Sequence, residues 1–181
     1  HFHLSLQSGC NTVLKRMNRR YTAEEYEHIV NVLRENIKDV SISTDVIVGF
    51  PGETEEEFNE TYEFLKKIKL TKTHIFKYSP RKGTRAAEMK GQIDGKVKEE
   101  RSKALIALND INEQGFIEKY INKNVKVLLE QQVKGKENIF EGYTENYIKV
   151  EVEKPENIKT GDIIECKIEK AYKDFAEGKI I

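Results

Sequence analysis

The sequence predicts an α/β protein in which an incomplete parallel (β/α) barrel fragment is followed by a small all-β, OB-like barrel. Strand-like apolar runs alternate with amphipathic helical stretches up to about residue 92, which favours parallel strands joined by crossover helices. From residue 120 the hydrophobic period becomes two, and polar turns separate short runs. A charged helical stretch lies between these parts. We therefore expect three segments, 1–92, 93–119 and 120–181.

The opening residues, HFHLSLQ, alternate polar and apolar side chains as a strand does. The pattern places His1, His3, Ser5 and Gln7 on one face and the apolar residues on the other. A polar face that is enclosed in a sheet usually lines a ligand cavity. Because the chain starts without Met inside this strand, we expect it to be a fragment whose earlier strands are missing.

Two capping boxes mark helices in this first part. Thr22 with Glu25, and Thr54 with Glu57, each have the S/T-x-x-E spacing that begins a helix. Strands are expected at 41–48 and 73–78, so the order is β-α-β-α-β, either a piece of a barrel or a piece of a doubly wound sheet. The β-branched run 46–48 predicts a strand covered on both faces.

Glycine, proline and polar residues follow each of the three predicted strands. The segments are SLQSGCN, VGFPGET and KYSPRKGT. Since parallel strands bring their carboxyl ends to one edge, where ligands bind in α/β proteins, we expect these segments to form a binding rim. Gly49 and Gly52 allow positive φ or a close approach of the backbone. The alternative is that these are only the residues that turns require.

The charge pattern is local rather than global. The chain has 31 Lys and Arg against 31 Asp and Glu, so net charge gives no argument for nucleic acid or membrane. Two segments after strand ends contain no acid, and their basic residues are Lys15, Arg16, Arg19, Arg20, Lys72, Lys77, Arg81, Lys82 and Arg85. We expect them to face phosphates or a carboxylate. The alternative is a solvated surface compensated by nearby acids such as Glu24, Glu25 and Glu88.

Several single residues suggest chemistry. Glu53 precedes a helix cap within a turn and could reach the ligand space, whereas the next three glutamates complement the helix dipole. Asp45, inside a strand, is either a ligand contact or half of a structural pair. His1 and His3 are expected as hydrogen-bonded lining residues rather than metal ligands, because no third ligand is in view. His74 is expected in the core or the lining.

The two cysteines, Cys10 and Cys166, have no metal-ligand or disulfide spacing. This pattern fits a reducing, cytoplasmic setting. The sequence has no membrane-length apolar run and no signal peptide, so no membrane partner is expected.

The C-terminal part places aromatic and basic residues together on a small barrel. Phe140, Tyr143 and Tyr147 lie near Lys134, Lys136 and Lys149. Aromatic rings and lysines on an OB-like barrel suit stacking on single-stranded nucleic acid. The alternative is a module that only packs against the first part.

Three motifs together carry a family resemblance. HFHLSLQSGCNTVLKRMNRRYT, TDVIVGFPGETEEEF and FKYSPRKGT, in this order, resemble the second half of the radical S-adenosylmethionine tRNA methylthiotransferases. The C-terminal segment resembles their TRAM domain. The SLQSGC form looks like the branch that modifies N6-threonylcarbamoyladenosine. The resemblance covers nearly the whole chain.

The resemblance implies a full-length enzyme with S-adenosylmethionine and two [4Fe–4S] clusters. In that family a 5′-deoxyadenosyl radical abstracts hydrogen from C2 of adenosine 37 in the tRNA anticodon loop, and sulfur and a methyl group are then added. The implied cluster cysteines lie outside this chain, so the fragment is expected to be inactive and to hold no metal. The sulfur and electron donors are not implied.

Carried over by position, a set of residues is expected at the S-adenosylmethionine pocket: Ser5, Gln7, Asp45, Gly49, Phe76 and Tyr78. A second set is expected to contact tRNA: Lys15, Arg16, Arg19, Arg20, Arg81, Arg85, Tyr143 and Tyr147. Some of the basic residues could instead contact the methionyl carboxylate. No catalytic residue is expected in this fragment.

Three other functions stay open from the sequence. The protein could belong to the isopentenyladenosine branch of the same family, or the chain could serve only as an RNA-binding module. An aldolase-like barrel would need a Schiff-base lysine inside a strand. Lys77 is the one plausible candidate, and the sequence shows no activating neighbour for it.

Overall fold

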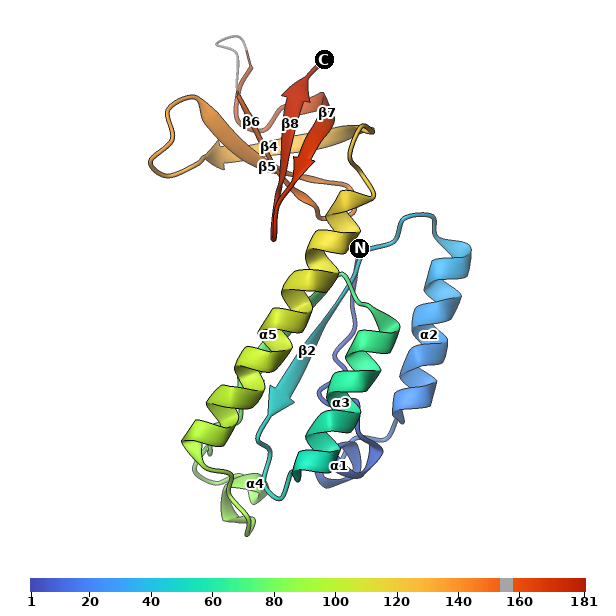
Figure 1. Cartoon of the computed structure of the whole chain (residues 1–181), viewed down its shortest axis with the longest axis vertical. Helices are drawn as coiled ribbons and strands as arrows, with labels where there is room; N and C mark the ends of the chain where they lie inside the picture. Colours follow the sequence, from blue (N-terminus) through green and yellow to red (C-terminus); the bar gives the residue numbers. More distant parts are fainter. Residues whose placement is uncertain (154–157) are drawn as a thin grey trace. The chain divides into compact units, whose positions relative to one another are not determined.

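The computed structural model describes residues 1–153 and 158–181, which form two compact units. One unit comprises Phe2–Asn109, and the other comprises Asp110–Ile181 together with His1. The division falls inside helix α5 (Gly95–Glu118) (Figure 1). None of the described helices combines the length and the apolar character that crossing a membrane requires.

The first unit is built on a parallel sheet in the order β1-β2-β3, as the sequence predicts. Its elements are β1 (Phe2–His3), α1 (Asn11–Arg16), α2 (Ala23–Asn36), β2 (Ile42–Val48), α3 (Glu55–Ile68), β3 (Lys72–Lys77) and α4 (Arg85–Glu88), followed by the first part of α5. Figure 1 shows the sheet running behind the long helices.

Strand β1 is much shorter than the expected seven residues. The backbone N–H of Leu6 donates to the Oγ1 of Thr44 (2.9 Å) instead of to a backbone carbonyl. Gln7, with a φ of 71°, then returns to the sheet through a single parallel bridge to Val46. The side-chain hydrogen bond and the left-handed residue interrupt the ladder, which alternation of side chains alone cannot reveal.

Both predicted capping boxes are present. The Oγ1 of Thr22 accepts from the backbone N–H of Glu25, and that of Thr54 accepts from the N–H of Glu57. Each glutamate side chain accepts in return from the cap residue's backbone N–H. The boxes therefore set the starts of α2 and α3 within a residue of the expected positions.

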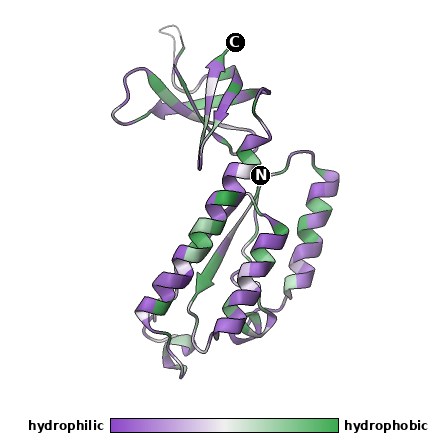
Figure 2. Ribbon diagram, in the orientation of Figure 1, coloured by the Kyte–Doolittle hydropathy of each residue, from purple (hydrophilic) through white to green (hydrophobic). Residues whose placement is uncertain are grey.

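Helices cover one face of the sheet. The core there includes Val30, Ile42, Val46, Leu65 and Leu105, and Figure 2 shows β2 as a largely hydrophobic strand beside amphipathic helices. The other face of β2 carries Ser43, Asp45 and Ile47. Because Asp45 and Ile47 are only half-buried, the expectation that this strand is covered on both faces is wrong for this chain. We call this second side the open face.

The second unit contains a closed five-stranded barrel in the order β4-β5-β6-β8-β7, which confirms the predicted small β-barrel. Its strands are β4 (Asn124–Gln132), β5 (Ile139–Thr144), β6 (Lys149–Glu153), β7 (Ile163–Ala171) and β8 (Ala176–Ile180). β6 and β8 run parallel, and the other pairs are antiparallel. A Cβ at Gly142 would lie 2.1 Å from the carbonyl oxygen of Leu128, so glycine allows β4 and β5 to approach at the bulge after Leu129.

Candidate functional site

The segments that follow the three parallel strands meet at one edge of the first unit, as predicted. Cys10, Val13 and Phe50 form a small buried cluster, and Tyr78 and Met89 pack against it. The N–H of Gly52 also donates to the carbonyl oxygen of Gly91 (2.8 Å). We call this edge the carboxyl-end rim, comprising residues 8–20, 49–54 and 78–91. It brings together residues that are far apart in the chain, such as Cys10 and Met89.

The turn after β2 requires glycine for two reasons. Gly49 has a φ of 71°, which favours glycine, and a Cβ at that position would lie 2.3 Å from the Cγ of Lys98. Its N–H donates to the Oε1 of Glu53 (2.9 Å). The amide of Gly49 is therefore used inside the turn. Glycine at this position shapes the backbone of the turn.

Glu53 points into the protein rather than toward a ligand, contrary to the sequence expectation. Its carboxylate accepts from the Nη1 of Arg101 (2.7 Å), and the two side chains are 3% and 7% exposed. Burial raises the pKa of the Glu53 carboxyl, while the Gly49 amide and the Arg101 guanidinium oppose that shift. Arg101 belongs to α5, 48 residues later in the chain. No local sequence pattern therefore predicts that it pairs with Glu53.

Arg16 is also occupied within the fold. Its Nη1 donates to the Oε1 of Glu57 (2.8 Å), and its Nη2 donates to the other carboxylate oxygen. Thr12 adds a hydrogen bond to the same carboxylate (2.6 Å). The hydrogen bonds from Arg16 lower the pKa of Glu57 to about 2. The pair ties α1 to the capping box of α3, so Arg16 has a structural task within the fold.

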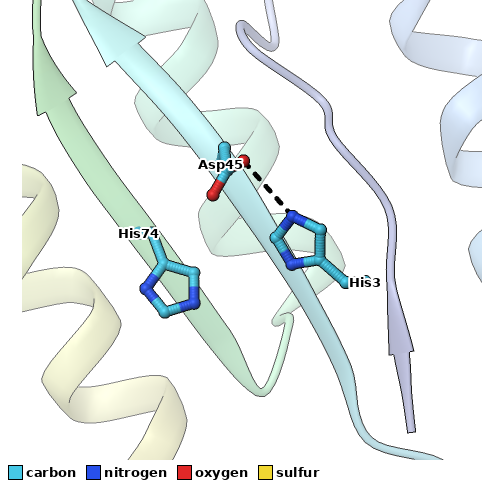
Figure 3. Close-up of side chains that lie close together, drawn as sticks. All are labelled: His3, Asp45 and His74. Atoms are coloured by element: carbon cyan, nitrogen blue, oxygen red, sulfur yellow. Dashed lines mark hydrogen bonds and ion pairs between the residues drawn. The ribbon is translucent and has the colours of Figure 1, made fainter.

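The open face brings together two histidines and a carboxylate. His3, Asp45 and His74 come from β1, β2 and β3, and their potential ligand atoms all lie within 4.8 Å of one another. Figure 3 shows the three side chains on neighbouring strands, and the Nε2 of His3 lies 3.2 Å from the Oδ2 of Asp45. The Nδ1 of His3 lies 3.0 Å from the Oγ of Ser43. His74 adds a third potential ligand beside His3 and Asp45, which the sequence did not reveal.

The six predicted S-adenosylmethionine residues fall into two places. Asp45 lies on the open face of β2, and Phe76 lies opposite Ile47 on the neighbouring β3. Phe76 is 53% exposed, and Ser5 is exposed as well. Gln7, Gly49 and Tyr78 lie at or near the rim. The backbone N–H of Gln7 donates to the carbonyl oxygen of Asp45 (2.8 Å), and the carbonyl oxygen of Gln7 accepts from the N–H of Ile47 (2.9 Å).

Tyr78 combines a packed ring with an unsatisfied hydroxyl. Its ring packs edge-on against Phe50 at 5.3 Å, and the Nζ of Lys98 lies 5.4 Å from its centroid. Its buried hydroxyl makes no hydrogen bond with any described residue. A buried polar atom of this kind marks a position at which a ligand's polar group could bind.

The remaining predicted basic residues are exposed around the rim. They make no ion pair with the described residues, and they are Lys15, Arg19, Arg20, Arg81, Lys82 and Arg85. Lys77 instead pairs with Glu99 at 2.7 Å. The basic segments are thus partly neutralised, and six cations are left to face solvent or a ligand.

In the second unit, Tyr143 and Tyr147 contact each other with ring centroids 5.5 Å apart, and Tyr147 is 63% exposed. The groove beside them also contains Lys126, Leu128 and Ile163 and three glutamates. This composition suits stacking on a base better than binding of a phosphate. The rings therefore form a platform at the barrel surface.

A second aromatic group in the barrel was missed by the sequence analysis. Tyr172 and Phe175 stack with centroids 4.6 Å apart, and the Nζ atoms of Lys136 and Lys149 lie 5.5 and 5.6 Å from the Phe175 ring. Two of the three predicted lysines thus lie beside Phe175, and both contact acids, Lys136 pairing with Glu151 and Lys149 approaching Asp174. The sequence signal that could have indicated this group is the pair Tyr172 and Phe175, three positions apart, with Lys173 between them.

Comparison with known proteins agrees with this architecture. The Radical SAM superfamily model matches residues 1–65, and the TRAM domain model matches residues 118–181. The threonylcarbamoyladenosine tRNA methylthiotransferase MtaB of Bacillus subtilis is 45% identical over the whole chain and 40% of its own length. That of Aquifex aeolicus is 48% identical over 84% of the chain and 36% of its own length.

A relative of the other branch matches nearly as well. The tRNA-2-methylthio-N(6)-dimethylallyladenosine synthase of Clostridium tetani is 41% identical over 99% of the chain and 39% of its own length. The chain spans about two fifths of the length of these relatives. The chain thus combines a Radical SAM match and a TRAM match in that order, and it is similar along its whole length to part of the radical S-adenosylmethionine tRNA methylthiotransferases.

Proposed function

We propose that this chain is part of an enzyme that adds a methylthio group to C2 of N6-threonylcarbamoyladenosine at position 37 of tRNA. The observation that carries the proposal is the Bacillus subtilis relative, which bears that activity in its name and is 45% identical over the whole chain. The activity belongs to a longer protein, because the chain corresponds to about two fifths of that relative. We place that protein in the cytoplasm, with tRNA as its partner.

The open face and the rim support binding of S-adenosylmethionine. Asp45 offers a carboxylate to ribose hydroxyls, and the half-exposed ring of Phe76 offers an apolar surface to adenine. The unsatisfied hydroxyl of Tyr78 offers a further hydrogen bond. When bound in the complete enzyme, this cofactor supplies the radical chemistry and the methyl group. The residues of this chain hold and orient it.

The iron–sulfur clusters do not fit this chain. Its two cysteines are both buried and belong to different units, whereas a [4Fe–4S] cluster is held by three or four cysteine thiolates. We assign the ligands of both clusters to parts of the protein outside this chain. Reconstitution of the 181-residue chain with iron and sulfide should accordingly give no cluster absorbance.

The exposed cations of the rim and the aromatic platform of the barrel support contact with an anticodon stem-loop. Arginine and lysine at the rim pair with phosphates, which carry the salt-dependent part of RNA affinity. Tyr143 and Tyr147 present rings to unpaired bases, which are the usual targets of aromatic side chains in RNA recognition. Each unit therefore contributes a different kind of contact.

Two alternatives have specific support. The Clostridium tetani relative, at 41% identity, favours N6-isopentenyl- or dimethylallyl-type adenosine as the substrate base. A non-catalytic RNA-binding role is favoured by the absence of a cysteine triad among the described residues, if the complete protein also lacks one. Both alternatives keep the tRNA partner and differ in the product.

The test is nucleoside analysis of tRNA from the source organism. Deletion of the gene that encodes this chain should remove 2-methylthio-N6-threonylcarbamoyladenosine and leave N6-threonylcarbamoyladenosine in its place, as measured by mass spectrometry. Reintroduction of the intact gene should restore the product. Loss of the methylthio-isopentenyl nucleoside would establish the other branch, and unchanged levels of both would contradict an enzymatic role in this modification.

A further inference from the structure

We propose that His3, Asp45 and His74 bind a divalent first-row transition-metal ion on the open face. We call these residues the His–Asp–His cluster. Each comes from a different strand, and the cluster lies entirely within the first unit. Two imidazoles and one carboxylate form a donor set that zinc and non-haem iron both use, with further positions left for water or a ligand.

The parallel register holds the three residues side by side. His3 is paired with Ser43, and Asp45 is paired with His74 across the neighbouring ladder. Asp45 and His74 are therefore direct neighbours, and His3, opposite Ser43, lies diagonally from Asp45 on the same face, so the three donors converge without help from any loop. Figure 3 shows the rings of His3 and His74 on either side of Asp45.

The spacing of the donors suits an ion after small side-chain rotations. All ligand atoms lie within 4.8 Å of one another. Donors bound at about 2.0 to 2.1 Å around a tetrahedral ion are about 3.3 Å apart. His3 and Asp45, at 3.2 Å, already have that separation. His74 is exposed, so its ring can rotate to complete the set.

The hydrogen bonding of His3 prepares its Nε2 as a donor to a metal. Ser43 Oγ lies 3.5 Å from the carbonyl oxygen of Phe2, which its hydroxyl can approach as donor, and 3.0 Å from the Nδ1 of His3. In the tautomer with the proton on Nδ1, the Ser43 oxygen accepts from Nδ1–H and its own proton is directed to Phe2. The lone pair of Nε2 then faces the carboxylate of Asp45. An oxygen partner on the second ring nitrogen is the usual arrangement behind metal-bound histidines.

Two arrangements satisfy the contact between the Nε2 of His3 and the Oδ2 of Asp45. A neutral Nε2 and an ionised Oδ2 are both hydrogen-bond acceptors, and they lie 3.2 Å apart. Either a proton on Nε2 or a metal ion resolves this contact. The nearby imidazole of His74 adds a second nitrogen donor, which a metal ion uses and a shared proton does not require. For this reason we favour the metal.

Metal binding by the His–Asp–His cluster is independent of the proposed function, because it involves this chain without cofactor or tRNA. It gives Asp45 a second assignment beside the S-adenosylmethionine pocket. The two assignments are separable, since metal binding is measured on the 181-residue chain and cofactor binding on the complete enzyme.

The experiment titrates the metal-free, untagged chain with Co²⁺ and then with Zn²⁺. The α-amino group and the imidazole of His3, at the third position, together form a chelate for Cu²⁺ and Ni²⁺, so those ions are avoided and the N-terminus is acetylated. We expect one Co²⁺ per chain, with visible d–d absorption of a nitrogen- and oxygen-ligated ion. We also expect no sulfur-to-cobalt charge-transfer band, and displacement by one equivalent of Zn²⁺.

Variants assign the ligands. His3→Ala, Asp45→Ala and His74→Ala should each weaken Co²⁺ binding by at least about 100-fold, and Ser43→Ala should weaken it by about 10- to 100-fold. His28→Ala, at an exposed position of α2, and His1→Ala serve as matched controls and should leave binding unchanged. Amide hydrogen exchange in β2 verifies that each variant is folded.

Three results would each overturn the proposal. One is a dissociation constant above about 1 mM for both ions at neutral pH. Another is tight binding that survives all three ligand substitutions. If NMR shows a protonated Nε2 on His3 that persists when Zn²⁺ is added, a proton rather than a metal joins His3 to Asp45, and the proposal fails.

Discussion

At the scale of single residues, buried ion pairs organise the turn after β2. Glu53 and Arg101 neutralise each other in the interior, and Glu53 also accepts from the Gly49 amide. A charge left unpaired in such a place is costly because it has lost its hydration. The residue that looked most available for chemistry therefore stabilises the backbone on which the candidate pocket depends.

Substitution of Glu53 should destabilise the first unit strongly. Glu53→Ala removes the buried carboxylate beside Arg101 and leaves its guanidinium only the exposed Glu55, so we expect a loss of about 3 to 5 kcal/mol in the free energy of unfolding. Glu55→Ala is the matched control, because Glu55 contacts the same arginine at 3.2 Å but is 66% exposed. It should cost less than about 1 kcal/mol. Urea dependence of amide exchange in β2 measures both, and equal effects would contradict this role of Glu53.

Acid should weaken the first unit through Glu57. Its pKa is held near 2 in the folded protein by Arg16, below the ordinary value of about 4.3 that applies after unfolding. A depressed carboxyl pKa gives stability that is present above the unfolded pKa and is lost as the pH falls toward 2. We expect a loss of about 1 to 2 kcal/mol from this group between pH 5 and pH 2.

The control for this pH effect is Glu57→Gln, which removes the titrating group. Other carboxyls with lowered pKa, such as Glu24 and Glu99, act in the same window, so the difference between wild type and variant isolates Glu57. The unfolding free energy of Glu57→Gln should change less over this pH range. Parallel pH profiles for the two proteins would refute the assignment.

At the scale of elements, local sequence patterns predicted those features that interactions between nearby residues determine, such as helix starts and barrel strands. The capping boxes at Thr22 and Thr54 need only residues three positions apart, and both were found from the sequence. The barrel strands follow from alternation of apolar side chains. By contrast, Arg16 meets Glu57 across 41 residues, and His74 meets Asp45 only through the register of two strands. Such contacts depend on tertiary packing, so the sequence did not reveal them.

The exposed cations of the rim should act on RNA through charge. We expect Arg20→Ala in the complete enzyme to weaken binding of an anticodon stem-loop by on the order of 1 kcal/mol, with a shallower salt dependence. Lys66→Ala, a cation on α3 that already pairs with Glu63, is the control. A salt-dependent binding series measures both. Unchanged affinity and salt slope for Arg20→Ala would remove it from the RNA surface.

The tyrosine platform should act through stacking instead. Tyr147→Ala should weaken binding of the same stem-loop by about 1 to 3 kcal/mol and leave the salt slope unaltered, because stacking on a base releases no counterions. Tyr147→Phe retains the ring and should bind nearly as wild type does. If the phenylalanine variant is as weak as the alanine variant, the hydroxyl rather than the ring makes the contact.

At the scale of the whole molecule, two units with separate cores carry separate parts of the proposed function. The first presents an open sheet face and a basic rim, and the second presents a closed barrel with exposed aromatic rings. The order of the two parts was predictable from the change of hydrophobic period. The open face was not predictable. The apolar run in β2 indicates a strand buried on both faces, but in this chain helices cover only one of them.

The most direct test of the central claim is the product formed by the purified, cluster-reconstituted complete enzyme. It would be incubated with S-adenosylmethionine, a reductant, a sulfur source and one of two tRNAs, bearing either N6-threonylcarbamoyladenosine or N6-isopentenyladenosine at position 37. Mass spectrometry of the digested nucleosides should show the 2-methylthio product with the threonylcarbamoyl tRNA. A 2-methylthio product confined to the isopentenyl tRNA, or no product with either tRNA, would contradict the account.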